Sequence, residues 1–507
     1  MRAPVVMPIP ANTILARRFG LDTQYEAVVF MHVACEVCRS EGLTAHNRVL
    51  LSHGSRQVIA TLYHLTDDLI RSDEAALSEA AWTRLDLREG DRVTVSHVPP
   101  LDSLSHVRSR VYGHDLGEPA FHAIIGDVVA GRYSDIHLSS FITACAARPM
   151  SEPEVLALTH AMVAAGDRLS WPAGVVVDKH SVGGLPGNRT TPIIVSIVAS
   201  LGLTMPKTSS RAITSPSGTA DTMETLAPVD LETDAIRRVV EQEHGCIVWG
   251  GAVRLSPADD ILIRVERALD LDTEGQMIAS VLSKKIAAGS THIVLDMPVG
   301  PTAKVRTAES ARSLTLGLAN VGEAFGLKTK IIQSDGSRPI GRGIGPSLEA
   351  RDVLAVLKGE TDAPQDLRAK SVALAGALLE LAGSVAPGEG ERIASHTLDS
   401  GKAWQKFQRI CEAQGGMRAP PVSRQRRPIV ADRSGALATI DNRKISRLAK
   451  LAGAPDDKAA GVELHVAPGD KVSAGDPLCT VHAESPGELA YAFDFVAVTP
   501  DIFLVNG

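Results

Sequence analysis

The stretch AGVVVDKHSVGGLPGNRTTPIIVSIVASLG, residues 173–202, contains the local pattern from which the fold class is predicted. It begins with a valine-rich run that is typical of a buried strand, and this run leads into a loop containing Gly183 and Gly184. The apolar run that follows could be a strand by composition, because it is rich in Ile and Val. Its length, Pro192 near its start and Gly202 at its end favour a helix with proline in the first turn. The stretch therefore predicts a strand, a glycine-rich loop and a helix.

The same alternation continues downstream. The runs CIVWGGAV (246–253), THIVLDMPVG (291–300) and TKIIQSD (329–335) are strand-like, and helical segments such as PSLEARDVLAVLKG (346–359) lie between them. Alternation of this kind predicts an α/β sheet that binds its ligand at the carboxyl ends of the strands. We expect this phosphate- and substrate-binding domain to comprise residues 173–261 and 291–420.

Three further domains are expected around the α/β domain. Residues 1–103 hold strand-like runs, HNRVLLSH and RQVIATLYHL, and predict a β-rich domain. Residues 104–172 have helical periodicity, and the helical segment at about 262–290 is expected to rejoin them. Residues 421–507 predict an α+β, barrel-like domain. Its PGDKVSAGDPLCTVHAESPG stretch resembles biotinyl or lipoyl carrier domains, but the hairpin lacks their lysine.

Composition narrows the function classes. The 507-residue chain carries a net charge of −7 and only 4% aromatic residues, which disfavours a nucleic-acid surface. Because there is no signal-peptide pattern and no run long enough for a membrane span, a cytoplasmic location is expected. Of the six cysteines only Cys35 and Cys38 form a CxxC, which lacks a second pair to complete a zinc site. Reduced thiols and no metal are expected.

The DKHSVGG segment places Lys179, His180 and Ser181 immediately before the glycines. A P-loop is excluded, because its Lys-Ser/Thr pair follows the glycines rather than preceding them. The segment still combines a strand end, closely approaching backbone and a helix start, with Lys179 as a point charge for an anion. The alternative is a tight turn with a surface lysine, and the adjacent histidine and serine favour the anion site.

Two other clusters carry polar side chains. In KTSSRAITSPSGTADTMETL, residues 207–226, Ser or Thr stands at 208, 209, 210, 214, 215, 217 and 219, and the segment leads into a helix; one or two of these hydroxyls could be caps of a serine-rich loop. In LDTEGQMIASVLSKK, Ser280 and Lys284 are four apart and share a helix face, with Asp272 before the helix. Taken alone, the Ser280 and Lys284 pattern favours a solvated helix face with an acidic N-terminus. Lys304 is equally ambiguous when it is considered alone.

Together and in this order, the three clusters resemble the thymidine phosphorylase family of nucleoside phosphorylases. DKHSVGG matches the phosphate signature of that family. PGNR, PKTSSRAITSPSGTADTME and LSPADDILIRVER resemble its second subfamily, the AMP phosphorylase-like branch. The resemblance covers nearly the whole chain after Ser105, and the additional N-terminal domain also fits that branch.

The resemblance implies a pentosyltransferase. Inorganic phosphate, as co-substrate without any cofactor, would cleave the base–sugar bond of a nucleoside or nucleoside 5′-monophosphate in nucleotide salvage or catabolism. The products would be the free base and α-(deoxy)ribose 1-phosphate or ribose 1,5-bisphosphate. The family resemblance also implies a homodimer or a higher homo-oligomer. Thymidine phosphorylase and AMP phosphorylase activities both remain open.

The resemblance also implies roles for individual residues. Lys179, Ser181 and Thr219 match phosphate ligands, with Thr191 and Ser209 as further candidates. His180 matches a histidine that assists a departing pyrimidine, and Asp272 matches the acid that protonates a departing base in AMP phosphorylases. The matched nucleoside- or nucleotide-binding positions are Gly184, Ser210, Arg211, Ala212, Ile213, Thr214, Ser215, Thr219, Ser280, Lys284 and Lys304.

Two alternatives to a phosphorylase are open at this point. An enzyme of the anthranilate phosphoribosyltransferase type would use a pyrophosphorylated sugar with Mg²⁺, and chelation by EDTA would stop it. An inactive nucleotide-binding scaffold would have kept the fold and lost the chemistry, although the presence of Lys179, His180, Ser181 and Asp272 argues against this.

Overall fold

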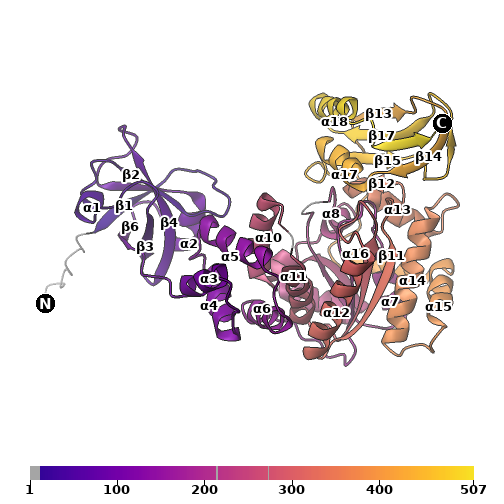
Figure 1. The fold of residues 1–507 in the computed structure, drawn as a ribbon, viewed down its shortest axis with the longest axis horizontal. Helices are drawn as coiled ribbons and strands as arrows, with labels where there is room; N and C mark the ends of the chain where they lie inside the picture. The colour runs from indigo at the N-terminus through magenta and orange to yellow at the C-terminus, as the bar shows by residue number, and fades with distance from the viewer. Residues whose placement is uncertain (1–11, 213–214, 272, 507) are drawn as a thin grey trace. The chain divides into compact units, whose positions relative to one another are not determined.

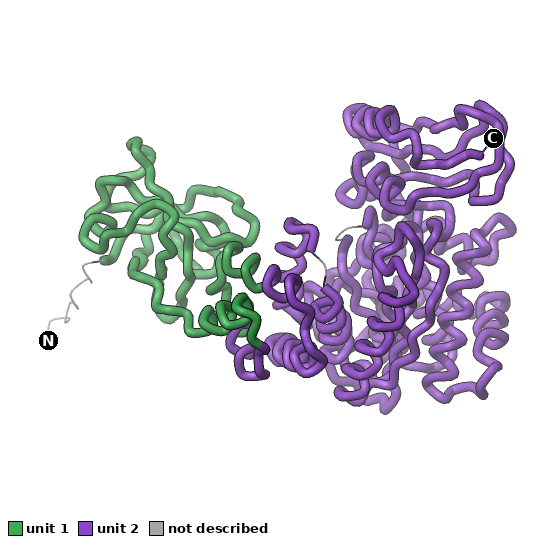
Figure 2. Tube along the Cα trace, in the orientation of Figure 1, with its two compact units in different colours: residues 1–114, 126–141 green, residues 115–125, 142–507 purple. Residues whose placement is uncertain are grey.

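The computed structural model describes residues 12–212, 215–271 and 273–506. The chain forms two compact units (Figure 2). Unit 1 comprises Met1–His114 and Gly126–Phe141, and unit 2 comprises Asp115–Ile125 and Ile142–Gly507. The helical segment after residue 104 thus contributes to both units.

Unit 1 contains a closed barrel of six strands in the order β1-β5-β2-β4-β3-β6 (Figure 1). The pairs β1–β5 and β2–β4 are parallel, and the other pairs are antiparallel. The strands are β1 (Thr13–Arg18), β2 (Val28–His32), β3 (Arg48–His53), β4 (Arg56–Leu65), β5 (Glu74–Leu77) and β6 (Arg92–His97). The two strands predicted from HNRVLLSH and RQVIATLYHL are confirmed as β3 and β4. Side chains such as Met31, Leu51 and Leu62 fill the interior.

Five helices of the described residues complete this part of the chain. They are α1 (Glu36–Ser40), α2 (Glu79–Leu85), α3 (Ser103–Val111), α4 (Glu118–Val129) and α5 (Asp135–Ala147). The α4 and α5 helices each contribute residues to both units. Cys35 and Cys38 lie at the start of α1 as buried free thiols.

The centre of unit 2 is a parallel sheet. The strands β7 (Val177–Ser181), β10 (His292–Val299) and β11 (Lys328–Asp335) pair in the order β11-β10-β7. A second parallel pair, β8 (Met205–Ser209) and β9 (Gly245–Trp249), is joined to β7 by one bridge between Val176 and Thr204. The predicted strand, loop and helix are confirmed, because β7 leads through the glycine loop into α7 (Thr191–Ser200), with proline in its first turn.

Helices cover this sheet and form its two cores. One core joins Ile193 and Ile197 of α7 to Leu378 of α14 (Gln365–Leu381) and Phe407 of α16 (Lys402–Ala413). The other packs α6 (Glu152–Ala164), α11 (Glu274–Ala287) and α12 (Ala308–Ala324) against β10. The remaining helices of this region are α8 (Thr219–Glu224), α9 (Thr233–Glu243), η1 (Gly250–Val253), α10 (Pro257–Leu269), α13 (Pro346–Lys358) and α15 (Gly390–Asp399).

The helical segment expected at about 262–290, with Asp272 before the helix that carries Ser280 and Lys284, corresponds to two helices in the structure. The α10 helix ends before Asp270, which adopts a left-handed backbone with φ +52°, and α11 begins at Glu274 after its cap, Thr273. Because a left-handed residue cannot continue a right-handed helix, the segment becomes two helices.

The last part of unit 2 contains two small sheets. One has the order β12-β15-β17-β13 and the other β16-β14-β18. Their elements are β12 (Gly343–Ile344), β13 (Gln425–Val430), β14 (Gly435–Ile440), α17 (Asn442–Leu451), β15 (Gly461–Leu464), β16 (Lys471–Val472), β17 (Pro477–Ala483), α18 (Pro486–Val498) and β18 (Phe503–Asn506). The short β12 strand comes from the α/β region, so this sheet is anchored beside the start of α13. Among the described residues, no helix has both the length and the apolar character that a membrane crossing requires.

We predict that Gln414→Ala destabilises the α/β region. The buried Gln414 side chain accepts a hydrogen bond from the Ile247 amide on edge strand β9 at 2.8 Å, and donates to the carbonyls of Pro228 and Ile247 at 2.8 and 3.0 Å. Loss of these partners should cost about 1–3 kcal/mol, seen as a thermal midpoint lowered by a few degrees. Gln408→Ala, on the exposed side of α16, is the control and should leave the midpoint unchanged.

Candidate active site

Lys179 occupies the centre of the candidate site. Its side chain is 2% exposed, and its Nζ donates hydrogen bonds to Ser181 Oγ at 2.5 Å and to Thr190 Oγ1 at 2.8 Å. Burial lowers the pKa of Lys179 to about 7, although the carboxylate of Asp296 opposes this shift. A lysine in this state can be neutral or charged near neutral pH, and an anion beside it would favour the charged form.

Asp296 of β10 organises the hydroxyl beside Lys179. It lies opposite Ser181 in the parallel register, and its Oδ2 accepts hydrogen bonds from Ser181 Oγ at 2.8 Å and Asn188 Nδ2 at 3.2 Å. Lys370 of α14 forms an ion pair with the same oxygen at 3.0 Å. Burial would raise the pKa of Asp296, but Lys179 and Lys370 outweigh it and hold that pKa below its usual value. Asp296 is therefore ionised in the site.

The other face of β7 carries a buried ion cluster. Because side chains alternate along a strand, Asp178 points away from Lys179. Its Oδ1 contacts Lys207 Nζ at 3.1 Å and its Oδ2 contacts Lys285 Nζ at 2.9 Å. Burial opposes ionisation of Asp178, but these two lysines hold its pKa below the usual value; burial also lowers the pKa of Lys207 to about 7.

His180 lies next to this positive cluster. Burial, together with the charges of Lys285 and Lys207, pushes its pKa well below the ordinary histidine value. His180 is therefore neutral at pH 7. A neutral imidazole can donate one hydrogen bond and accept another, but it does not act as a positively charged acid.

The glycine loop lets neighbouring segments approach the site closely. Gly187 has φ +72°, and a Cβ there would lie 2.0 Å from the carbonyl oxygen of Ile340. A Cβ on Gly183 would lie 2.8 Å from Lys304 Cβ, and one on Gly184 would lie 3.1 Å from Ser215 Cβ. Lys304 and Ser215, predicted from separate parts of the sequence, therefore both lie against the loop that follows Lys179.

Arg189 connects the loop to the serine-rich segment. Its NH1 donates to Thr219 Oγ1 at 2.6 Å and its NH2 donates to the Ser217 carbonyl at 2.8 Å. Its Nε forms an ion pair with Glu349 of α13 at 2.7 Å. Thr219 is thus positioned by a buried guanidinium that the sequence did not identify as part of the site.

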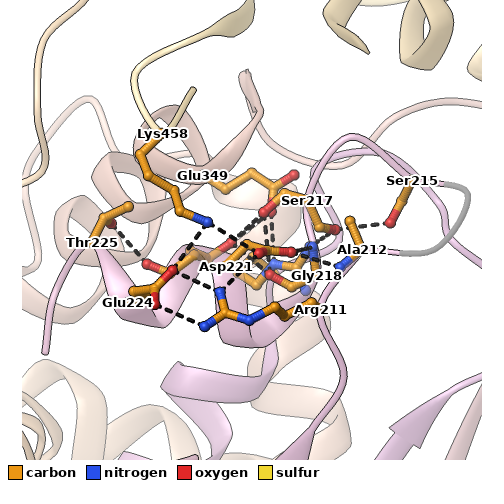
Figure 3. Close-up of polar contacts among 12 residues, drawn as sticks. Arg211, Ala212, Ser215, Ser217, Gly218, Asp221, Glu224, Thr225, Glu349 and Lys458 are labelled. Carbon is orange, nitrogen blue, oxygen red and sulfur yellow. Dashed lines mark hydrogen bonds and ion pairs between the residues drawn. The ribbon is translucent and has the colours of Figure 1, made fainter. Parts of the chain in front are cut away.

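The serine-rich segment forms a loop that is held by acidic side chains of α8 (Figure 3). Asp221 accepts hydrogen bonds from the amides of Ala212 at 2.6 Å and Gly218 at 2.9 Å. Arg211 forms a two-pronged pair with Glu224, at 2.7 and 2.8 Å, and its guanidinium lies 5.0 Å from the Trp249 ring. The Arg211 side chain is therefore engaged within the protein.

The third predicted cluster lies on α11. Ser280 is half-buried there, and Lys284 forms an ion pair with Asp259 of α10. Burial lowers the pKa of Lys284, but Asp259 outweighs this and raises it above the usual lysine value, so Lys284 is charged. Its charge contributes to the lowered pKa of His180.

Several predicted residues have other placements. Thr191 is buried at the start of α7, and its neighbour Thr190 is the threonine that contacts Lys179. Ser209 ends β8 as a half-buried residue, and the Ser210 carbonyl accepts the Ala220 amide at 3.4 Å. Asp272, Ile213 and Thr214 lie outside the described residues. Among the described residues, no group of three His, Cys, Asp or Glu side chains is arranged to hold a metal ion.

The sequence analysis missed Asp296, Lys370, Arg189 and Glu349. Asp296 had a recognisable signal, because it is an acidic residue inside the apolar run THIVLDMPVG. Lys370 and Glu349 lie in ordinary helical segments, where a single charge carries no such signal.

Comparisons with known proteins cover most of the chain. Models described as the glycosyl transferase family helical bundle domain and a/b domain match residues 104–166 and 173–404, and the pyrimidine nucleoside phosphorylase C-terminal domain matches 436–499. The chain is similar to proteins named "Putative thymidine phosphorylase". One from Chelativorans sp. (strain BNC1) is 60% identical over 97% of this chain and 96% of its own length. Another, from Parvibaculum lavamentivorans, is 57% identical over 100% of both chains.

A solved structure shows a related fold. Anthranilate phosphoribosyltransferase from Thermus thermophilus matches 61% of this chain and 98% of its own, with a TM-score of 0.50 and 20% identity. At this identity the likeness concerns the fold alone. Together with the domain matches, it confirms the predicted combination of a helical bundle and an α/β domain.

We predict that Asp178→Asn strongly destabilises unit 2, because it leaves two buried lysines without a carboxylate. Loss of one partner of such a pair should cost about 3–5 kcal/mol at pH 7. Since the pKa of Asp178 is lowered by folding, its contribution is present above the unfolded-state pKa of about 4 and is lost as pH falls through the folded-state value. The gap in thermal midpoint between variant and wild type should therefore narrow in acid.

The matched control for this measurement is Asp234→Asn. Asp234 is exposed on α9 and pairs on the surface with Arg237, at 3.4 Å. Its midpoint should follow the wild type at every pH. Equal midpoints for Asp178→Asn and wild type at pH 7 would show that the buried cluster does not stabilise the fold.

Proposed function

The chain belongs to the thymidine phosphorylase family of glycosyl transferases, and we propose that it catalyses phosphorolysis of a nucleoside or a nucleoside 5′-monophosphate. A phosphate oxygen forms the new bond to C1′ of the sugar as the C1′–N bond breaks. The electron pair of that bond leaves with the base, which then takes up a proton. The products are the free base and the sugar 1-phosphate, or ribose 1,5-bisphosphate from a ribonucleoside monophosphate.

The buried Lys179 is the single observation that carries this proposal. Its Nζ is held by two hydroxyls, of Ser181 and Thr190, at the end of a strand that opens into a glycine loop. Lys179 would supply a cation, and the Thr190 hydroxyl, which accepts a hydrogen bond from Lys179, would donate its own proton to an oxyanion. The Ser181 hydroxyl donates to Asp296 and would have to turn toward the phosphate to bind it. Fixing the phosphate nucleophile in this way contributes to catalysis by positioning it against C1′.

The leaving base requires a second group. The transition state resembles an oxocarbenium ion, as in other glycosyl transfers, so charge accumulates on the departing base. We propose that neutral His180 donates a hydrogen bond to a departing pyrimidine. For a purine, Asp272 is the proposed proton donor on the basis of the family resemblance.

A nucleoside monophosphate is the second candidate substrate. The hydroxyl-rich loop that includes Ser215 lies against Gly184, next to the proposed phosphate site, and its hydroxyls could hold a 5′-phosphate. The residues that would make this AMP phosphorylase-type contact are those of the 210–215 segment together with Lys304.

We predict phosphate-dependent base release from at least one member of a panel of thymidine, uridine, cytidine, adenosine, AMP, CMP and UMP. The reaction should continue in EDTA, which would stop a Mg²⁺-dependent phosphoribosyltransferase. Lys179→Ala should lower kcat/KM at least about a hundredfold, as loss of a main charge-stabilising group does. Lys402→Ala, an exposed lysine on α16, is the control.

The panel separates the alternatives. Reaction of nucleosides alone would contradict the 5′-phosphate role of the 210–215 segment. Inactivity on the whole panel would contradict phosphorolysis and favour a nucleotide-binding scaffold. Full activity of Lys179→Ala would contradict the phosphate assignment.

We also predict that phosphate binding at pH 8 draws a proton onto Lys179. With a pKa of about 7 in the free site, Lys179 is mostly neutral at pH 8. A bound phosphate dianion favours the ammonium form, so the pKa rises and up to one proton enters the complex. Phosphate affinity should correspondingly weaken as pH rises above 7.

Titration calorimetry in two buffers of different ionisation enthalpy measures this uptake. The wild type and Lys402→Ala should show a buffer-dependent enthalpy that corresponds to proton uptake. Lys179→Arg keeps the charge at all pH values and should lose that dependence. Proton release by the wild type, or the same uptake by Lys179→Arg, would contradict the prediction.

A further inference from the structure

The buried carboxylate of Asp221 connects two parts of the serine-rich segment (Figure 3). Asp221 is 2% exposed and accepts the amides of Ala212 and Gly218, which lie on the two sides of the loop. The two sides are also in direct contact, because a Cβ on Gly218 would lie 2.6 Å from the carbonyl carbon of Arg211. The placement of Ala212 against Gly218 therefore depends on the position of Asp221.

Asp221 shares its counter-charges with Glu224. Arg211 pairs with both carboxylates, closely with Glu224 and at 3.4 Å with Asp221. Lys458 does the same, with its Nζ 3.2 Å from Asp221 Oδ1 and 3.0 Å from Glu224 Oε2. The cluster thus contains two carboxylates and two cations. Removing one cation leaves an uncompensated negative charge at a nearly buried position.

Lys458 comes from the C-terminal part of the chain, and its backbone is firmly placed. Its carbonyl accepts the Ser347 amide at 3.0 Å, at the start of α13. A few residues later, Gly461 packs so closely that a Cβ would lie 2.1 Å from the Ile344 carbonyl oxygen. The α13 helix also carries Glu349, which holds Arg189 and through it Thr219. Lys458 is therefore fixed to the same framework as the site.

We propose that Lys458 is a positioning residue for the organic substrate, acting through Asp221 and Glu224 on Ala212 and Gly218, and through these residues on the neighbouring Ser215. The proposal rests on the proposed function, because the serine-rich loop is a substrate-binding segment only in a phosphorylase. It gives the C-terminal part of the chain a direct role in substrate affinity. It also makes Arg211 a structural partner of the loop through its ion pairs with Glu224 and Asp221.

Steady-state kinetics with the organic substrate and with phosphate tests the proposal. Lys458→Met keeps the length of the side chain and removes the charge. It should raise KM for the organic substrate on the order of tenfold, with kcat and the KM for phosphate within about twofold of wild type. Lys458→Arg should restore most of the affinity, and the exposed Lys471→Met in β16 should have no effect.

A double-mutant cycle distinguishes charge compensation from a general packing defect. Glu224→Gln removes one negative charge from the same cluster. If Lys458 acts by compensating that charge, the loss of substrate affinity in Glu224→Gln/Lys458→Met should be smaller than the sum of the losses in the two single variants. Three results would overturn the proposal. They are an additive cycle, a fall in kcat and a rise in the KM for phosphate as large as the rise in the KM for the organic substrate, and failure of Lys458→Arg to restore that KM.

Hydrogen exchange gives a readout that does not depend on activity. The Ala212 and Gly218 amides should exchange about tenfold faster in Lys458→Met, while the Ile247 amide in β9 should be unchanged. If wild type proves inactive on every substrate, the proposed function fails, but this measurement still decides whether Lys458 holds the loop. Unchanged exchange at Ala212 and Gly218 would overturn the positioning role, and if Lys458→Met does not fold, Lys458→Gln replaces it in the same measurements.

Discussion

The buried carboxylate of Asp178 is the constraint on which the α/β region depends. It pairs with Lys207 of β8 and Lys285 of α11, so one side chain joins β7 to a second strand pair and to a helix. The backbone link between the three-stranded sheet and the β8–β9 pair is one bridge, between Val176 and Thr204. The ion pairs of Asp178 therefore add a second connection between these two groups of strands. A carboxylate at such a depth is stable only with both cations, and each cation requires the carboxylate in return. Burial, together with the charges of Lys285 and Lys207 in this cluster, holds the pKa of His180 well below its usual value.

Strand β7 places the buried ion cluster and the proposed phosphate site on its two opposite faces. Asp178 faces the ion cluster, whereas Lys179 and Ser181 face the hydroxyls and Asp296. Because alternation along a strand is obligatory, neighbouring residues can have opposite tasks within one short segment. Lys179 is consequently buried close to other cations, and its pKa falls to about 7. The proposed phosphate site therefore contains a lysine that can take up a proton when a negatively charged ligand binds.

The sequence predicted those parts that depend on local pattern. The strand, glycine loop and helix around Lys179 were readable from periodicity and from Pro192, and the polar residues next to the glycines identified the candidate anion site. Asp296 and Lys370 were missed because they reach the site only through the parallel strand register and helix packing, across more than 100 residues of sequence. The sequence analysis began the second helix after Asp272, but it did not predict the left-handed turn at Asp270 that ends the first helix, because a left-handed residue leaves little signal when it is not glycine.

The choice of lysine at position 179 follows from the charge balance of the unliganded site. A permanently charged arginine there would need its own buried carboxylate, and that carboxylate would repel an incoming phosphate. Asp296 lies nearby, but it already forms an ion pair with Lys370 at 3.0 Å and accepts a hydrogen bond from the Ser334 hydroxyl at 2.6 Å. Its charge is therefore largely compensated. A lysine that can lose its proton needs no additional buried carboxylate when phosphate is not bound. In the proposed phosphate site, this arrangement would allow a dianion to bind without an equal positive charge being buried there beforehand.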